Sequence, residues 1–405
     1  MKICLINNLY PPVAESGASI VAQNIAEGLK SAGHDIFVIS TAPYEDKNSF
    51  TPKKRELGGV RVYEFFPANV YHYLNGSRHN FFVRFIWHIC DILNLHSFFV
   101  VKKILEDEKP DIVWTHNLMG VGMLAVEAVK LLGLRHWHTA HDVQLSLPSG
   151  LIIWGQENNA EAKSRLRPLY ERAMRDILGN PEIVFSPSKW LLDFYVGRGF
   201  FAGSKQIVLQ NQVINLGVSG TLQACRVPET QKSEVRFLYL GQIEAHKGAR
   251  MLVKTFRHLL NSGNNNLELV LAGGGAILEE IKMMAFDEGR IKILGPVAHK
   301  KIGELFARAD YLIVPSLCYE NSPTVIFESF FYGVPVIASN LGGMSEIIRD
   351  GENGYLFAPN EAALEEAILR ALSHLDEKEK MCHNGYNDIL KLSLDKYLEE
   401  VQTLF

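Results

Sequence analysis

Two glutamates separated by seven residues, Glu320 and Glu328, enclose the stretch Asn-Ser-Pro-Thr-Val-Ile-Phe. Because an apolar strand-like run, Asp310–Pro315, precedes them, we predict Glu320 in a loop at a strand end and Glu328 inside the next helix. Ligands of open parallel α/β sheets bind outside the carboxyl ends of the strands, and helix-start amides bind anions. This combination suits a ligand with hydroxyls and phosphate, such as a nucleotide sugar. The alternative is two solvated glutamates beside a helix start.

A lysine occupies a similar position earlier in the same half of the chain. In Leu240-Gly-Gln-Ile-Glu-Ala-His-Lys-Gly248, a strand ends, Gly241 allows a tight turn, and Lys247 stands just before a predicted helix start. An ammonium group beside free helix-start amides makes a compact diphosphate site. The alternative is an ordinary surface lysine. The next predicted strand ends in a glycine triplet, residues 273–275, whose small residues admit close backbone approach to a ligand.

The first half of the chain delivers histidines to predicted strand ends. His116 follows the strand 111–114, and His141, with Asp142 beside it, follows the strand 135–140. Each is a site candidate, with a structural histidine as the alternative, whereas His136 and His138 lie within the strand and are interpreted as structural.

The loop from Tyr10 to Gly17 joins the first strand to its helix. Ser16 is expected to cap that helix, and Gly17 to bring bare backbone close to a phosphate. The loop lacks the G-x-G-x-x-G fingerprint, so a dehydrogenase has no support from it.

The bulk composition indicates a globular protein of several domains. The chain has 405 residues, 47% of them hydrophobic and 21% charged, with a net charge of −4, so no strong positive field attracts nucleic acid. Its five cysteines are odd in number and scattered, which favours a reducing cytosol over a disulfide frame. The apolar run at the N-terminus is too short for a signal peptide, and we expect a cytoplasmic protein.

Strand-like runs alternate with helical patterns throughout, which predicts an α/β protein with parallel sheets in two Rossmann-like domains. We place the first domain at 1–212 and the second at 213–385, and expect a C-terminal helix over about 386–405 to pack back on the first. The predicted strands are 2–6, 35–39, 60–65, 111–114, 135–140, 182–185 and 206–209, then 235–240, 267–272, 290–294, 310–315, 334–338 and 354–357.

Taken together, the segments resemble the retaining GT-B glycosyltransferases of family four, which move sugars from nucleotide donors to make α-linked products. The resemblance covers essentially the whole chain, and the order of its segments is highly specific. They are the Pro-Pro…Ser-Gly17 loop, Ser186-Pro-Ser-Lys-Trp190, Gly241…Lys247-Gly248, Glu320…Glu328, and Gly342-Gly-Met-Ser-Glu346 followed by Asp350-Gly-Glu-Asn-Gly354.

The resemblance implies a GT-B fold, with two Rossmann-like domains facing across a cleft, and a role for each matched residue. Gly17 would approach the donor's diphosphate and Lys247 would bind it. Glu320 would hold hydroxyls of the transferred sugar, Glu328 those of the ribose, and His141 a hydroxyl near the reacting carbon. The catalytic set would be His141, Lys247 and Glu320. The remaining donor-binding positions would be Gln242, Gly274, Asn321, Ser322, Pro323, Thr324 and Val325.

Two positions depart from the family pattern. Gln242 stands where an arginine is usual, so Lys247 must carry more of the diphosphate charge unless a residue such as Arg250 helps. Ser16-Gly17 replaces a common Gly-Gly pair. No Asp-x-Asp motif stands at a strand end, which is consistent with a metal-independent enzyme that needs no cofactor besides its donor substrate.

The most apolar region spans residues 81–103 and is interrupted by Arg84 and Asp91, so it is too short to cross a membrane. We interpret it as a pair of core helices. The alternative is an interfacial surface that reaches a lipid-linked or membrane glycan acceptor.

The leading function is therefore a glycosyltransferase that uses a UDP- or GDP-linked hexose and a glycan or lipid-linked acceptor. The alternatives on the same fold are a sugar-nucleotide epimerase, a phosphorylase, or a nucleotide-sugar-binding protein without catalysis. A phosphorylase would need a lysine for pyridoxal phosphate, of which the sequence gives no positive sign.

Overall fold

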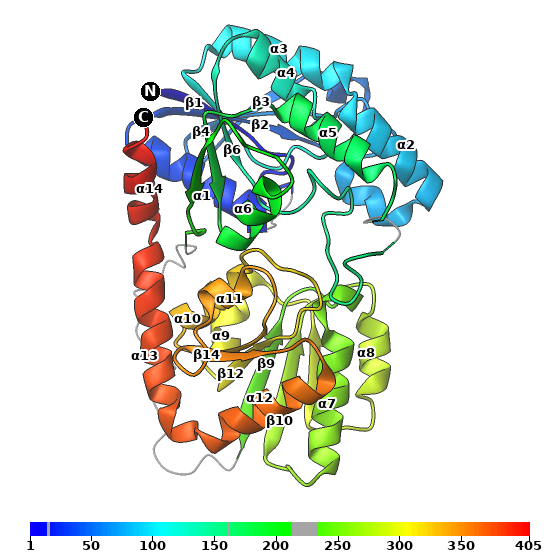
Figure 1. The fold of residues 1–405 in the computed structure, drawn as a ribbon, viewed down its shortest axis with the longest axis vertical. Coiled ribbons are helices and arrows are strands. Elements are labelled where there is room, and N and C mark those ends of the chain that lie inside the picture. Colours follow the sequence, from blue (N-terminus) through cyan, green and yellow to red (C-terminus); the bar gives the residue numbers. More distant parts are fainter. Residues whose placement is uncertain (14–16, 160–162, 213–233) are drawn as a thin grey trace. The chain divides into compact units, whose positions relative to one another are not determined.

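The computed structural model describes residues 1–13, 17–159, 163–212 and 234–405. They form two compact units, coloured along the chain in Figure 1. The first unit comprises residues 1–151, 158–214 and 394–405, and the second comprises 152–157 and 215–393. The boundary expected near residue 212 falls in the stretch 213–233, which lies outside the described residues. The short segment 152–157 belongs to the second unit although its neighbours in sequence belong to the first, which the sequence did not predict.

The sheet of the first unit is parallel except at one edge. Its strand order is β3-β4-β2-β1-β5-β6-β7-β8, and only β3 and β4 pair antiparallel. From β1 the chain moves outward through β2 and then returns to β5 on the other side of β1, so the strand order reverses there. The strands are β1 (Lys2–Ile6), β2 (Asp35–Thr41), β3 (Lys53–Leu57), β4 (Val60–Phe65), β5 (Ile112–Thr115), β6 (Arg135–Thr139), β7 (Ile183–Ser186) and β8 (Lys205–Val208).

Helices cover this sheet, and polar caps fix where several of them begin. The side chain of Asn80 accepts a hydrogen bond from the Val83 amide at the start of α2, and Ser188 caps α6 in the same way. The helices are α1 (Gly17–Ser31), α2 (Phe81–Ile92), α3 (Leu95–Glu108), α4 (Ala125–Leu131), α5 (Arg167–Leu178), α6 (Lys189–Val196) and α14 (Leu394–Gln402). Short 3-10 turns, η1 (Lys47–Phe50) and η2 (Tyr73–Arg78), precede α2.

The C-terminal helix α14 completes the core of the first unit. Tyr397, Leu398 and Val401 are buried in the same hydrophobic cluster as Val21 and Ile25 of α1. The region 378–405, expected to end in one helix, instead contains α13 (Lys378–Ile389) in the second unit and α14 in the first.

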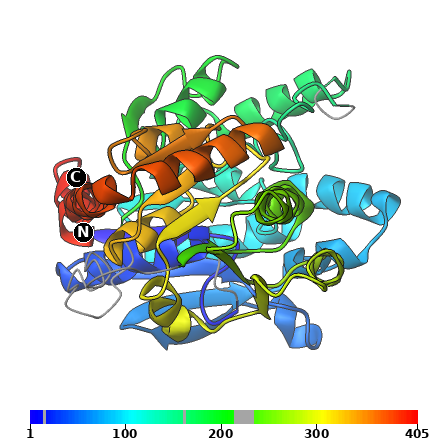
Figure 2. The same cartoon turned by 90° about the horizontal axis from the view of Figure 1, so that it is seen from below.

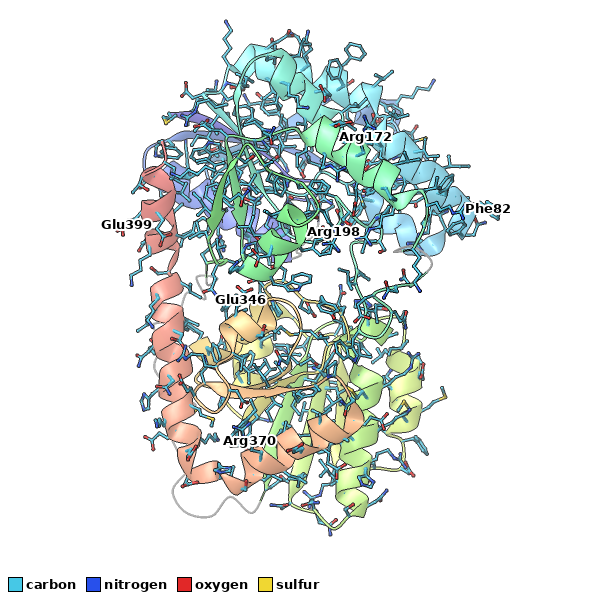
Figure 3. All side chains as sticks on the ribbon, viewed as in Figure 1. Phe82, Arg172, Arg198, Glu346, Arg370 and Glu399 are labelled. Carbon is cyan, nitrogen blue, oxygen red and sulfur yellow. The ribbon has the colours of Figure 1, made fainter. Side chains whose placement is uncertain are left out.

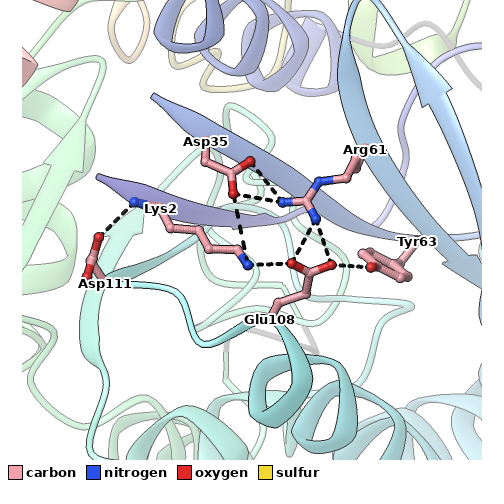
Figure 4. Close-up of polar contacts among 6 residues, drawn as sticks. All are labelled: Lys2, Asp35, Arg61, Tyr63, Glu108 and Asp111. Carbon is pink, nitrogen blue, oxygen red and sulfur yellow. Dashed lines mark hydrogen bonds and ion pairs between the residues drawn. The ribbon is translucent and has the colours of Figure 1, made fainter. Parts of the chain in front are cut away.

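A network of charged side chains joins the amino-terminal edge of this sheet to the end of α3 (Figure 4). Lys2 Nζ lies 2.6 Å from Glu108 Oε2, and Arg61 binds both Glu108, at 2.9 Å, and Asp35, at 2.8 Å. Tyr63 donates a further hydrogen bond to Glu108. Burial raises the pKa of Glu108, but the hydrogen bonds from Lys2 and Tyr63 and the charge of Arg61 outweigh it and lower that pKa to about 2.

The second unit contains a fully parallel sheet with the order β11-β10-β9-β12-β13-β14. From β9 the chain moves outward through β10 and β11 and then returns to β12 on the other side of β9. The strand order therefore reverses between β9 and β12, the kind of point at which open α/β sheets bind ligands outside the carboxyl ends of their strands. The strands are β9 (Val235–Leu240), β10 (Leu267–Ala272), β11 (Ile291–Gly295), β12 (Tyr311–Val314), β13 (Val336–Ser339) and β14 (Gly354–Phe357).

An apolar core fixes the helices of the second unit on its sheet. Phe256 of α7 packs edge-on against Phe237 of β9, which stacks on Tyr311 of β12. The helix α7 is seen nearly end-on in Figure 2. The helices are α7 (Ala249–Asn261), α8 (Leu278–Met284), α9 (Ile302–Phe306), α10 (Thr324–Phe331), α11 (Met344–Ile347), α12 (Glu361–Ser373) and α13, with 3-10 turns η3 (Ala245–Lys247), η4 (His299–Lys301), η5 (Leu375–Glu377) and η6 (Leu390–Leu392). Over the described ranges, no helix is long and apolar enough to cross a bilayer.

Candidate active site

Lys247 lies at the end of η3, in the loop that joins β9 to α7. Gly248, the next residue, has a left-handed backbone with φ of 77°, and a Cβ placed there would lie 1.8 Å from the carbonyl oxygen of Pro315. The loops after β9 and β12 therefore touch backbone to backbone, which only glycine permits at this position. The amide of Leu317 adds a 2.8 Å hydrogen bond to the carbonyl of His246. This close contact brings Lys247 to the Glu320 loop.

Lys247 and Glu320 form a partly buried ion pair. The Nζ of Lys247 donates to Oε1 of Glu320 at 2.6 Å, and the hydroxyl of Ser316 donates to the same oxygen, also at 2.6 Å. Burial disfavours the ammonium charge, but the carboxylate of Glu320 outweighs it and raises the pKa of Lys247. The lysine is therefore charged at neutral pH, and its three N–H donors exceed what one carboxylate oxygen can accept.

The two glycines of the segment Gly342–Glu346 hold the Glu320 loop from the other side. The amide of Gly343 donates to the carbonyl oxygen of Glu320 at 2.8 Å. Gly342 has φ of 58°, and a Cβ there would lie 2.3 Å from the same oxygen. The left-handed backbone and close approach at Gly342 explain why glycine stands at that position, whereas the sequence offered it only as part of a family pattern.

The segment Asn321–Val325 leads into α10, as predicted. Pro323 is the N-cap residue, and the first turn of α10 carries no acidic side chain that would neutralise its amides. The hydroxyl of Ser322 is hidden from solvent and has no hydrogen-bond partner. A buried hydroxyl without a partner is costly, so this position favours a bound ligand that completes its hydrogen bonding.

Glu328 lies inside α10, as predicted, and is buried. Its Oε1 lies 3.3 Å from Nε2 of His299, in η4. Burial raises the pKa of Glu328, and His299 opposes the shift. His299 was not predicted as a site residue, because nothing in the neighbouring sequence distinguishes it from a surface histidine.

The glycine triplet after β10 serves close packing of two strand-end loops. A Cβ on Gly273 would lie 1.7 Å from the carbonyl oxygen of Gly241. Gly274, a predicted donor-binding residue, accepts a 2.8 Å hydrogen bond from the Ile243 amide. The triplet thus has a structural explanation, and its contact with a ligand stays a prediction.

No second cation lies free beside Lys247 at the two positions that the sequence singled out, the neutral Gln242 and the candidate helper Arg250. Gln242 is exposed in the loop after β9, and its role in donor binding stays a prediction. Arg250, considered as a helper, instead pairs with Glu280 of α8, with one nitrogen at 2.6 Å from the carboxylate.

In the first unit, two histidines meet at the carboxyl ends of β5 and β6. Nδ1 of His116 and Nε2 of His141 are 2.9 Å apart, and the rings stack with centroids separated by 5.2 Å. Burial lowers the pKa of His141 to about 4. Burial and the neighbouring His141 and His138 lower that of His116. Both imidazoles are therefore neutral at pH 7, and one must donate the shared proton to the other.

His136 and His138, interpreted as structural, are buried and share the Thr115 hydroxyl, at 2.8 and 2.9 Å. Nε2 of His116, in contrast, is buried with no hydrogen-bond partner. His116 therefore belongs with His141 rather than with the structural pair.

A pocket surrounds this histidine pair and is closed on one side by α2. Its lining includes His141 and Asp142 from the end of β6 and His88 and Asp91 from α2. Burial raises the pKa of both Asp91 and Asp142 to about 7. A hydrogen bond from the Gly120 amide to Asp91, and one from the Gln144 amide to Asp142, lower the pKa but do not cancel this effect. Asp91 was not predicted as a site residue, although it is the only acidic residue in the apolar stretch 81–103.

The loop that leads into α1 is described by the structure only in part. Gly17 begins α1, as expected. Ser16, its expected cap, lies outside the described residues. The role of Gly17 at a diphosphate stays a prediction.

Comparisons with known proteins identify the family and the fold. The glycosyl transferase 4-like domain model matches residues 16–212, and the glycosyl transferases group 1 model matches 225–388. An uncharacterized glycosyltransferase of Methanocaldococcus jannaschii is 24% identical over 418 residues, covering 100% of this chain and 98% of that protein. Sucrose-phosphate synthase from Thermosynechococcus elongatus shares the fold with a TM-score of 0.75 at 20% identity, covering 100% and 98% of the two chains. HepE of Anabaena, in complex with UDP, has a TM-score of 0.71 at 17% identity, covering 100% and 99%.

The chain belongs to the GT-B glycosyltransferases of family four. The predicted family and fold class are therefore confirmed. Its two parallel-sheet domains carry the predicted residues at the carboxyl ends of their strands, Lys247 and Glu320 in the second unit and His141 in the first.

One element of this glycosyltransferase was missed by the sequence analysis. The segment 152–157 pairs with the loop before Glu320, through an antiparallel bridge between Ile153 and Cys318 and a 2.7 Å hydrogen bond from the Trp154 amide to the Leu317 carbonyl. The hydroxyl of Tyr319 also donates to Glu157 at 3.0 Å. No apolar alternation marks so short a pairing segment, so the sequence held no signal for it.

Proposed function

We propose that this glycosyltransferase transfers a hexose from a UDP- or GDP-linked donor to a glycan or lipid-linked acceptor, with retention of configuration and without a metal ion or other cofactor. The product would be an α-glycoside. We further propose that it acts at the cytoplasmic side of a membrane as a peripheral protein.

The arrangement of Lys247 and Glu320 carries the proposal. Both lie where the strand order of the second sheet reverses, beside the start of α10 and the buried Ser322 hydroxyl. A cation, helix-start amides and an unsatisfied hydroxyl suit a diphosphate, and a neighbouring carboxylate suits sugar hydroxyls. HepE, which shares the fold, was solved with UDP and with UDP-glucose, and this supports a uridine donor here.

The chemistry follows from where charge develops. Departure of the nucleoside diphosphate builds negative charge on its leaving oxygen, and prearranged donors at that oxygen are usually the largest contribution to such a reaction. Lys247 can keep its bond to Glu320 and still donate to the diphosphate, because it has three N–H groups. The cation and the amides of α10 would thereby do what a divalent ion does in other transferases.

The remaining residues would hold and orient the reactants. Glu328, buried in α10, would accept hydrogen bonds from the ribose hydroxyls in place of its contact with His299. His141 would bind a hydroxyl of the transferred sugar, with His116 fixing its ring. The acceptor hydroxyl would attack on the face that the diphosphate leaves, and the diphosphate would take its proton.

Calorimetry and a transfer assay on the same protein test the proposal. We expect UDP or GDP to bind and transfer to survive EDTA. We expect Lys247→Ala and Glu328→Ala each to weaken nucleotide binding by about one to two decades, since a charge-assisted hydrogen bond contributes roughly 1.5–3 kcal/mol. Lys282→Ala, which removes an exposed lysine of α8, is the matched control.

Three results would count against this function. A strict requirement for a divalent ion would remove metal independence, and unchanged affinity in both variants would remove the site assignment. A protein that binds the nucleotide sugar but only epimerises it, or leaves it intact with every acceptor class, would favour the alternative functions.

A further inference from the structure

Helix α2 carries an exposed aromatic face, which we define as Phe81, Phe82, Phe85, Ile86 and Ile89. Phe81 and Phe82 are 75% and 76% exposed, and the other three side chains are also exposed. Successive residues of a helix are separated by about 100°, so these five lie within about 140° of arc. Phe82 lies at the outer edge of α2 in Figure 3. The interpretation of this helix as part of a core is therefore wrong for this face.

The opposite side of α2 is firmly anchored, so the exposure does not reflect a loosely packed helix. Trp87 is buried and donates from its indole nitrogen to the Tyr71 carbonyl at 2.8 Å. Both carboxylate oxygens of Asp91 accept from the Gly120 amide at 3.0 Å. The aromatic face is thus held outward on a fixed helix, where an exposed apolar patch of this kind marks an interaction surface.

The chain segment that contains the aromatic face is richer in basic than in acidic residues. Residues 66–104 contain four lysines and arginines and a single carboxylate, that of Asp91, which is buried. Lys102 and Lys103 pair with acidic residues one turn further along α3. Arg78 and Arg84 are exposed near the start of α2, and Arg84 lies about 60° around the helix from Phe81, beside the border of the aromatic face.

We propose that the aromatic face of α2, together with Arg78 and Arg84, docks the first unit on an anionic lipid bilayer. Aromatic side chains on a fixed helix enter the headgroup boundary, and flanking cations meet lipid phosphates. Segment 66–104, all of which the structure describes, carries no exposed carboxylate that could pair with Arg84 across a contact between two copies of this face, which disfavours dimerisation through it.

The same helix connects this surface to the pocket of His141. Asp91 lines the pocket from the side of α2 opposite the aromatic face, and His88 lines it from the flank beside Phe81. Under the proposed function, on which this step rests, a saccharide attached to a lipid in the bilayer would be presented to the pocket across a single helix. The aromatic face thus selects acceptors that are themselves anchored in the membrane.

Vesicle sedimentation with the full chain tests the docking surface. We expect binding to vesicles of phosphatidylcholine and phosphatidylglycerol in equal parts, and weaker binding to phosphatidylcholine alone or at high salt. The double variant Phe81→Ser/Phe82→Ser should bind at least about tenfold more weakly. Arg84→Ser should lose about fivefold on the mixed vesicles only. Phe286→Ser, which removes a phenylalanine 91% exposed in the second unit, is the matched control and should bind as the wild type does.

Vesicle binding that the double variant leaves unchanged, or no binding by the wild type, would overturn the docking surface. A monomer–dimer shift that the double variant abolishes, without vesicle binding, would assign the face to a second copy and overturn it too. Calorimetry with UDP and GDP in free solution separates this outcome from the proposed function, since the donor residues lie in the second unit. Failure of nucleotide binding would sink the proposed function and leave the vesicle result standing.

Discussion

At the scale of single residues, Lys247 and Glu320 form an ion pair that was not predicted from the sequence. Each residue was predicted separately, one for the diphosphate and one for the sugar. In the structure, Nζ of Lys247 donates to Oε1 of Glu320 at 2.6 Å. Part of the hydrogen-bonding capacity that the diphosphate would need from the lysine is therefore already used by the carboxylate. Under the proposed function, donor binding and sugar orientation would therefore be coupled through one ion pair.

This coupling predicts opposite effects on binding and turnover for Glu320→Gln. Removing a negative charge near the diphosphate and freeing Lys247 should leave nucleotide affinity unchanged or raise it by up to about tenfold. Turnover should fall by about a hundredfold, because the transferred sugar loses its orienting carboxylate. Calorimetry and initial rates measure the two effects. Glu279→Gln, at an exposed position of α8, is the control, and a parallel loss of affinity and turnover in Glu320→Gln would contradict the coupling.

His141→Ala should separate a catalytic from a structural histidine. We expect turnover to fall by at least about tenfold while the affinity for the bare nucleoside diphosphate moves little, because small errors of orientation at the reacting carbon are costly. His116→Asn should lower turnover less, since it acts only through the ring of His141. Melting, binding and turnover are measured on each variant. Normal turnover in a destabilised His141→Ala protein would remove this residue from the site.

At the scale of elements, the sequence predicted the strands well because most of them are apolar and buried. Every predicted strand is present within two residues of its expected bounds. The strand β3 was missed because its sequence, Lys-Lys-Arg-Glu-Leu, has no apolar alternation. It is an edge strand, and charged side chains on an edge prevent pairing with other chains. Helix α2 was located correctly but assigned to the core, because helical periodicity alone cannot tell a buried apolar face from an exposed one.

The attachment of α2 to the Gly120 loop should respond to pH through Asp91. Its pKa of about 7 lies above the unfolded value, so its contribution to stability is present at low pH and is lost as pH rises through 7. Asn at this position keeps the acceptor for the Gly120 amide without the charge. The difference in melting temperature, Asp91→Asn minus wild type, should therefore become more positive as pH rises from about 4 to 7 and level off above about pH 8. Asp107→Asn, at an exposed position of α3, should show a constant difference, and the same behaviour in Asp91→Asn would contradict the assignment.

At the scale of the whole molecule, the sequence predicted two domains but treated each as a nearly continuous stretch of chain. Apolar periodicity reports local structure, so it could not show that 152–157 pairs with the loop before Glu320. A C-terminal helix packed on the first domain was expected, but its contact with α1 was not, and α13 was not separated from α14 because nothing apolar distinguishes the turn between them. Both features depend on contacts between segments that are distant in the sequence, and apolar periodicity carries no information on such contacts.

The chain passes from one unit to the other at four places, after residues 151, 157, 214 and 393. A protease that cuts within 213–233 would yield two fragments, each carrying an element that completes the other's unit. The first fragment would keep 152–157, which pairs with the loop before Glu320, and the second would keep α14, which fills the core beside α1. We expect the fragments to co-elute in gel filtration after limited proteolysis, and separate elution under native conditions would contradict this. The two halves of the gene would thus behave as complementing partners, each unable to finish its own domain alone.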